Sequence, residues 1–272
     1  MNRTIRRSVT VFVLSLAAAT TLFAHDLFLL PSAFFVAPES TVSIKLLNGT
    51  FEKSEGSVAA SRVRDLSVVT PGGRKAAPRS GWRETGDTSV FPVRVGDSGN
   101  YVIGVSTFPR IIRLEAMDFN TYLATEGSPQ ILSERRKARE DTLPARERYS
   151  KHVKAILQVG SSQSPNYAAV LGYPVELVPL DNPYALVRGK GLRVRALIDG
   201  KPESSQLLYY GGRHANGRAM RERSVRTDST GIASVRLPSG GKWYVKFIHM
   251  VKVARGTVDY ESKWATITFG TK

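Results

Sequence analysis

Hydrophobic and polar positions alternate in short runs through the first part of the chain. Residues 42–47 alternate at a period near two, and residues 66–68 run into a Pro-Gly-Gly turn cluster. Residues 90–95 and 101–105 are apolar runs on either side of a polar loop. A period of two is typical of strands that bury one face, and the last two runs predict a hairpin.

The spacing changes between residues 142 and 159. Four apolar residues there fall at i, i+4, i+7 and i+8, which is one face of a helix: Tyr149, Val153, Ile156 and Leu157. Thr142 is a suitable helix cap, Pro144 is tolerated in a first turn, and Gly160 is a plausible stop. This stretch therefore predicts a lone helix.

The strand pattern returns at residue 192. One face of residues 192–198 is apolar, and further strands are expected at 206–210, 232–237, 243–251 and 263–269. Asp-Gly and Asn-Gly pairs at 199–200 and 216–217 mark turns between them. About six strands in some 80 residues fit an immunoglobulin-like sandwich.

These patterns predict a mainly β fold. We expect two β-sandwich parts, immunoglobulin- or transthyretin-like, with one helical insertion around residues 142–159. The N-terminal β domain would span residues 25–185 and include the insertion, and the C-terminal immunoglobulin-like sandwich would span residues 186–272. A chain of 272 residues is long enough for one large domain or two small ones.

Residues 1–24 have the layout of a secretory signal peptide. Three arginines precede a short apolar run over residues 9–19, and small residues follow. Cleavage is expected after Ala24, although the bulky Leu22 keeps a cut after Ala19 open, and a retained anchor is a further alternative. We expect a soluble mature protein in a bacterial periplasm.

The amino-acid composition excludes several kinds of site and limits the choice of partner. The chain has no cysteine, which excludes disulfides, thiolate metal sites and a cysteine nucleophile. The formal charge of +16 would suit nucleic acid, but export argues against that partner. The densest basic stretch, residues 135–154, is interleaved with acids. A solvated helix face explains it, with contact to an anionic membrane surface or an acidic partner as the alternative.

Several short motifs occur in a fixed order: HDLFLLP at 25–31, FNTYL at 119–123, YSK at 149–151, GYPVELVP at 172–179, NP at 182–183, DGKP at 199–202, TD at 227–228 with Gly231, GKW at 241–243 and WATITF at 264–269. In this order the chain resembles the exported proteins of domain-of-unknown-function family 4198. That family is described as periplasmic components of nickel or cobalt uptake systems. The resemblance therefore implies a metal-handling role beside an envelope metal transporter.

His25 is the strongest candidate ligand. If cleavage leaves it first, its α-amino group and imidazole chelate one metal ion in a six-membered ring. Both groups lose their protons near neutral pH, and nitrogen ligands suit nickel and copper. The alternative is a histidine that merely follows a cleavage site.

The other candidates lie far from His25 in the sequence. His249 shares strand parity with apolar neighbours, so it is a core histidine or a second ligand at the strand end. His214 falls in a loop, where binding residues are common. Asp26 would orient His25, add an oxygen ligand or form a salt bridge, and His152 lies among charged residues.

We expect a non-enzymatic binding protein for a divalent transition metal (Ni, Co or Cu), with His25, His249, His214 and Asp26 as candidate ligands. One alternative is an interaction module that binds a protein or glycan without metal. A second alternative is a copper enzyme that uses the terminal histidine for oxidative chemistry.

Overall fold

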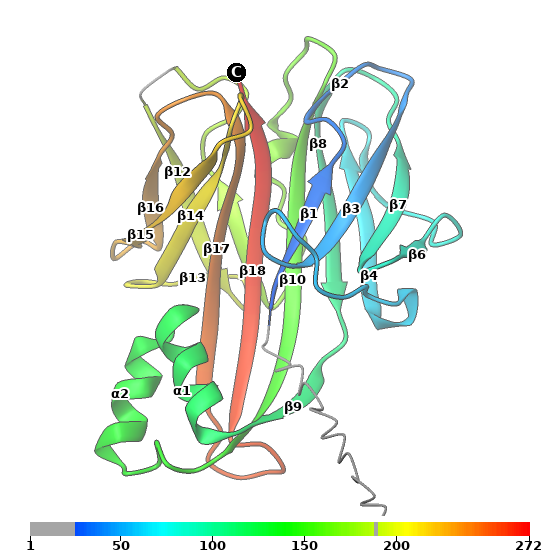
Figure 1. Ribbon diagram of the computed structural model, residues 1–272. Helices are drawn as coiled ribbons and strands as arrows, with labels where there is room; N and C mark the ends of the chain where they lie inside the picture. The colour runs from blue at the N-terminus through cyan, green and yellow to red at the C-terminus, as the bar shows by residue number, and fades with distance from the viewer. Residues whose placement is uncertain (1–24, 188–189) are drawn as a thin grey trace, which may run out of the picture.

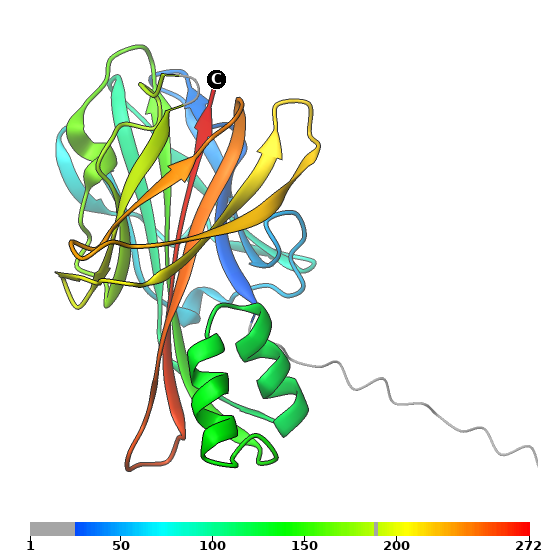
Figure 2. The same cartoon turned by 90° about the vertical axis from the view of Figure 1, so that its left-hand side faces the viewer.

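The computed structural model describes residues 25–187 and 190–272, so the expected signal peptide lies outside the described residues. Strands dominate, and within this part they form one central sheet of ten strands and two outer sheets of four (Figure 1). The long strands in the middle of the central sheet reach well beyond both outer sheets, and the helices lie against this extension (Figure 2).

Eight strands of the central sheet follow one another in the order β15 (Ala219–Arg226), β14 (Leu207–His214), β17 (Gly241–Lys252), β18 (Tyr260–Thr271), β10 (Ala145–Val159), β8 (Gly99–Thr107), β4 (Val63–Thr70) and β5 (Gly73–Ala76). The other two strands, β2 (Phe35–Val36) and β9 (Arg110–Leu114), pair with β10. The first outer sheet has the order β1 (Asp26–Pro31), β3 (Thr41–Gly49), β7 (Thr88–Arg94), β6 (Arg83–Thr85). The second outer sheet contains β11 (Val175–Pro179), β12 (Gly191–Ile198), β13 (Lys201–Pro202) and β16 (Ile232–Arg236).

The outer sheets cover opposite faces of the central sheet. Val153, Ala155 and Leu157 of β10 belong to the core that β1, β3 and β7 share with the central sheet. Ile156 belongs to the other core, which contains β11 and β12. Since side chains alternate across a strand, β10 buries both of its faces. The predicted mainly β fold with sandwich-like parts is confirmed.

The predicted helix at residues 142–159 is wrong, because Ala145–Val159 is the strand β10. A strand covered on both faces carries apolar residues at odd and even positions, so its period of two disappears. In β10 the remaining apolar positions happened to fit a helical spacing. Short apolar runs cannot be assigned by periodicity alone.

The predicted hairpin of residues 90–95 and 101–105 is also wrong. Both segments are strands, but β7 pairs with β3 and β6 in the first outer sheet, whereas β8 pairs with β4 and β10 in the central sheet. The chain therefore crosses from one layer of the sandwich to another at residues 95–98.

Two helices follow β9. They are α1 (Ala116–Thr125) and α2 (Pro129–Lys137), and short 3₁₀ turns occur at Ala60–Arg62 and Pro165–Ala168. Phe119, Tyr122 and Leu123 fall at i, i+3 and i+4 and are fully buried. The Tyr122 ring stacks on Trp264 of β18, with centroids 5.8 Å apart and planes 2° apart. The helices thus cover the apolar surface of the long strands below the outer sheets.

The predicted domain boundary between residues 185 and 186 falls between β11 and β12, which pair in register from Val175–Ile198 to Pro179–Val194. β10 and β18, from opposite sides of that boundary, also pair with each other. Strands from both predicted domains therefore share two sheets. The division into two domains, and the immunoglobulin-like character of the parts, stay predictions.

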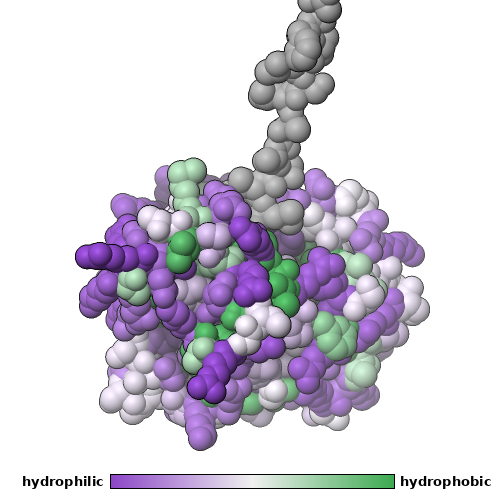
Figure 3. Space-filling model, turned by 90° about the horizontal axis from the view of Figure 1, so that it is seen from below, coloured by the Kyte–Doolittle hydropathy of each residue, from purple (hydrophilic) through white to green (hydrophobic). Residues whose placement is uncertain are grey.

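The underside of the molecule is mostly hydrophilic, with small apolar areas between polar side chains (Figure 3). Met117 of α1 and Leu143 are among the exposed apolar residues, with 78% and 54% of their surface accessible. Neither described helix is long and apolar enough to cross a bilayer. Contact with an anionic membrane surface stays a prediction.

Candidate functional site

The first strand places a buried carboxylate beside a buried ammonium group. Asp26 opens β1 and is 9% exposed, and Lys246 in β17 is 8% exposed. The Lys246 ammonium donates a hydrogen bond to the Asp26 carboxylate. Burial raises the pKa of the Asp26 carboxyl, while the positive charge of Lys246 acts against that rise. An isolated charge at either position would be costly, so each requires the other.

Two further carboxylates approach the same ammonium group. Glu126, just after α1, lies 3.2 Å from Lys246 Nζ, and Glu222 of β15 lies 3.4 Å from it. The Tyr244 hydroxyl donates to Glu222 at 2.8 Å. Three carboxylates around one ammonium outweigh the effect of burial and hold the pKa of Lys246 well above its ordinary value. The group is therefore negative overall.

These residues line a pocket of about 200 Å³ at the start of β1. His25 is on its wall with Asp26, Glu126, Glu222 and Lys246. Phe28 and Phe51, whose rings pack edge to face with centroids 5.5 Å apart, also line it. A small pocket with surplus negative charge favours a cation.

His25 is held at both its side chain and its backbone. Its Nε2 lies 3.0 Å from Glu55 Oε2, and its carbonyl oxygen accepts a hydrogen bond from the Lys151 ammonium. Burial is the main cause that lowers the pKa of His25, and the charge of Glu55 opposes it. Near neutral pH the imidazole is therefore neutral and available as a ligand.

Lys151 is itself unusual. It is 5% exposed, donates to Asn48 Oδ1 at 3.0 Å, and lies 5.5 Å from the ring centroids of Tyr149 and Trp264. Burial lowers the pKa of its ammonium group to about 8. Lys151 thus anchors the start of β1 from the neighbouring central sheet.

The structure does not bring His249 or His214 to this pocket. His249 is half-buried in a separate pocket of about 360 Å³ between α2 and the ends of β14 and β17, and burial lowers its pKa. His214 lines a third pocket, where its Nδ1 lies 2.7 Å from Ser239 Oγ. Across residues 25–187 and 190–272, no three His, Asp or Glu side chains converge on a possible metal position.

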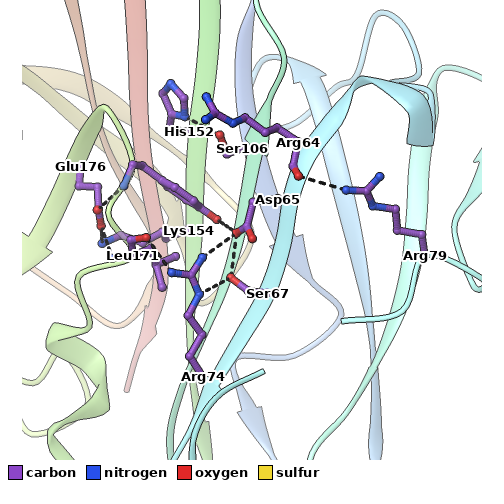
Figure 4. Close-up of polar contacts among 11 residues, drawn as sticks. Arg64, Asp65, Ser67, Arg74, Arg79, Ser106, His152, Lys154, Leu171 and Glu176 are labelled. Atoms are coloured by element: carbon purple, nitrogen blue, oxygen red, sulfur yellow. Dashed lines mark hydrogen bonds and ion pairs between the residues drawn. The ribbon is translucent and has the colours of Figure 1, made fainter. Parts of the chain in front are cut away.

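A second polar cluster joins the central sheet to the loop before β11 (Figure 4). Lys154 Nζ lies 2.9 Å from Glu176 Oε2, with both side chains almost fully buried. Glu176 also accepts the backbone N–H groups of Leu171 and Tyr173 at 2.9 and 2.8 Å. Desolvation lowers the pKa of Lys154, and Glu176 opposes that effect. With its hydrogen-bonding groups paired and no access to solvent, this pair is structural.

His152 lies near this cluster and is 3% exposed (Figure 4). Its Nδ1 is 2.9 Å from Ser106 Oγ and its Nε2 is 3.1 Å from Ser150 Oγ. Burial lowers its pKa to about 4, so the ring is neutral at pH 7. With both nitrogens engaged, His152 bridges two strands.

Sequence reasoning missed Lys246, Glu126, Glu222, Glu55 and Lys151. The sequence contains one signal that points to Lys246. Lys246 interrupts the run Trp-Tyr-Val-Lys-Phe-Ile, where apolar residues occupy both strand faces. A lysine buried there needs carboxylate partners, but only the fold identifies which carboxylates meet it.

Comparison with known proteins gives one family. The sequence model of a domain of unknown function, DUF4198, matches residues 22–251. No curated protein matches the chain. Trypsin-activated α-2-macroglobulin of Escherichia coli is a structural neighbour with 12% identity and a TM-score of 0.26, covering 91% of this chain and 16% of its own.

Two other solved structures are similar at the same low level. A DUF4785 family protein of Legionella pneumophila has 9% identity and a TM-score of 0.24, covering 79% of this chain and 49% of its own. Murine CEACAM1b has 9% identity and a TM-score of 0.21, covering 91% and 100%. This chain thus spans less than half the length of the first two neighbours.

Proposed function

The chain belongs to the DUF4198 family, and we propose that it is an exported periplasmic binding protein for a divalent transition metal, nickel or cobalt in preference. It would act as an accessory to metal uptake beside an envelope transporter. One observation carries the proposal: His25 lies on the wall of a negatively charged pocket with its Nε2 held by Glu55.

The Glu55 contact decides which ring nitrogen is the ligand. A metal-bound histidine typically donates its other ring N–H to a carboxylate, which fixes the tautomer and ring orientation. We assign the proton to Nε2, 3.0 Å from Glu55 Oε2, which leaves the lone pair on Nδ1. Nδ1 and the nitrogen of the same residue form a six-membered chelate ring when cleavage after Ala24 makes that nitrogen a free amine. Two ligand atoms then come from one residue.

The pocket adds electrostatic attraction. Glu126 and Glu222 leave the group around Lys246 with surplus negative charge, and both are about one-third exposed. Asp26 has the role of an ion-pair partner in this proposal, because Lys246 occupies its carboxylate. His249 and His214 are not part of the ligand set, since each lines a different pocket.

The test starts from the protein as it is exported. Intact mass and N-terminal sequencing establish the first residue, and calorimetric titration with Ni²⁺, Co²⁺ and Cu²⁺ follows. We expect a start at His25 and one-to-one binding that is lost in His25→Ala. Glu55→Gln, which removes the orienting charge, should weaken binding by about tenfold or more.

Two controls make the test specific. A chain with one extra methionine before His25 keeps the imidazole but replaces the amine by an amide, and it should bind far more weakly. His214→Ala removes a histidine from another pocket and should leave the affinity unchanged. A different first residue, or equal affinity in all variants, overturns the proposal.

The same titration separates the alternatives. An interaction module without metal would bind its partner equally well after chelator treatment. A copper enzyme would show redox turnover with Cu²⁺ and a reductant, whereas a carrier binds the ion without turnover.

A further inference from the structure

The third pocket, which His214 lines, opens between the edges of two sheets. β15 is an edge strand of the central sheet, and β16 pairs with β12 in the second outer sheet. The pocket between them has a volume of about 200 Å³, and Tyr210 and Trp243 are among the residues that line it. We call it the edge slot. Trp243 of β17 lines the edge slot, whereas Tyr244 and Lys246, on the other face of β17, line the His25 pocket.

The charge of the edge slot is entirely positive. Four arginines line it, Arg218, Arg221, Arg223 and Arg236, and no Asp or Glu does. None of their guanidinium groups forms an ion pair or hydrogen bond with any residue in the part of the chain that the structure describes. Other exposed arginines of this protein do pair: Arg193 binds Asp181 at 2.6 Å, and Arg94 lies 3.2 Å from Glu39.

The charged side chains at positions 221–223 of β15 alternate between the two faces of the central sheet. A β-bulge lies at the same place: Tyr210 is opposite Arg223 and Gly212 is opposite Met220, so Arg221 and Glu222 both face the single residue Gly211. Glu222 extends to Tyr244 and Lys246 on one face, while Arg221 and Arg223 line the slot on the other. The only acid within 219–226 is thus removed from the arginines.

We propose that the edge slot binds a phosphate group. Guanidinium groups form paired hydrogen bonds with phosphate oxygens, and a phosphate with nearly two negative charges at pH 7 relieves the mutual repulsion of four cations better than a single carboxylate. The competing explanation is that inward-pointing charges on an edge strand prevent sheets of two molecules from pairing. That role needs neither a pocket nor an arginine from a second sheet.

The position of His214 fits this assignment. It lines the same slot as the four arginines, with Nδ1 engaged by Ser239. A surrounding of four positive charges disfavours a metal cation at this histidine and favours an anion. The proposal is independent of metal binding at His25, so either can fail without the other.

The experiment uses the mature protein at low ionic strength. Inorganic phosphate is titrated by calorimetry into wild type, Arg223→Gln, Arg236→Gln and a matched control, Arg255→Gln, which removes one exposed arginine between β17 and β18. Thermal unfolding of each variant confirms that it is folded, and Arg223→Lys keeps the charge without the paired geometry. A second arm measures co-sedimentation with phosphatidylglycerol vesicles and, for comparison, phosphatidylcholine vesicles.

We expect saturable phosphate binding that Arg223→Gln and Arg236→Gln each weaken by about tenfold, whereas Arg255→Gln leaves it unchanged. Binding of free phosphate identifies a soluble phosphate ligand. Binding only to phosphatidylglycerol vesicles, lost in the same two variants, identifies a lipid headgroup as the source. No binding in either arm, or equal effects of Arg223→Gln and Arg255→Gln, overturns the proposal.

Discussion

The Lys151 ammonium donates a hydrogen bond to the backbone carbonyl oxygen of His25, across 126 positions of sequence. A strand in the middle of the central sheet thereby fixes the residue that begins the described chain. Because the same ammonium also binds Asn48, the anchor ties β10 to both β1 and β3. This contact places a buried, titratable lysine directly against the backbone of His25.

Lys151 makes stability depend on pH. Its pKa is about 8 in the folded protein and 10.5 in the unfolded chain, so the unfolded chain holds more protons between these values. Stability therefore rises with pH in this window, because the penalty for burying the charge disappears. Urea unfolding at pH 7.5, 8.5 and 9.5 should show a gain of roughly 1–2 kcal/mol for wild type relative to Lys151→Met. The same change of unfolding free energy with pH in both proteins would contradict this prediction.

The pH dependence of metal affinity should follow the amine and not the imidazole. The pKa of His25 is lowered, so its ring is already neutral above pH 6.5. A terminal amine titrates near 8, and the metal must displace its proton. The Ni²⁺ affinity should rise about tenfold from pH 6.5 to 7.5 and level off above about pH 8. Competition titrations in non-coordinating buffers measure it, and a plateau already reached at pH 6.5 would exclude the amine.

Replacing one partner of the buried pair Lys154–Glu176 should lower the free energy of unfolding more than replacing both partners. Lys154→Met leaves Glu176 buried without its cation and should cost about 3–5 kcal/mol in the free energy of unfolding. Lys154→Met with Glu176→Gln should recover much of that loss, because the amide still accepts a backbone N–H without carrying a charge. Urea unfolding measures each step. Additive losses in the double variant would show that the pair is not coupled.

The helices should be stabilised by their contact with β17 and β18 and not by their own sequences. Leu123 of α1 is fully buried, and Leu123→Ala should cost about 2–5 kcal/mol. Thr121→Ala, an exposed neighbour on the same helix, is the control and should change stability little. In Leu123→Ala, hydrogen exchange should show that α1 and α2 lose protection first. Equal effects of the two substitutions would contradict this account.

The strands were predictable wherever one face is polar or the flanking turns are clear. β3, β12 and β16 alternate, and Asn-Gly marks the turn after β14. β10 was not predictable in this way, because two sheets cover it and its alternation is gone. The pairing of strands was also hidden, since β7 and β8 are adjacent in sequence but lie in different sheets.

For the candidate site, the sequence indicated His25 but not its surroundings. Glu55, Glu126, Glu222 and Lys246 come from four separate segments, and no local spacing links them. Asp26 was assigned three possible roles, and the structure places it in an ion pair with Lys246. The sequence does not show which charged strand residues are buried, so it does not show which of them must form ion pairs.

The parallel pairing of β10 with β18 also constrains when the protein can fold. Glu147 through Ala155 meet Tyr260 through Thr268, more than one hundred residues later. During folding, β10 has no neighbour on that side until residues 260–271 are in place. Pairing over such distances is slow. Until it occurs, β10 and β17, many of whose side chains are buried in the folded protein, expose strand edges that can pair with other incompletely folded chains. A chaperone that shields β10 and β17 before β18 pairs with them would therefore protect this protein more than one that acts on the folded sandwich.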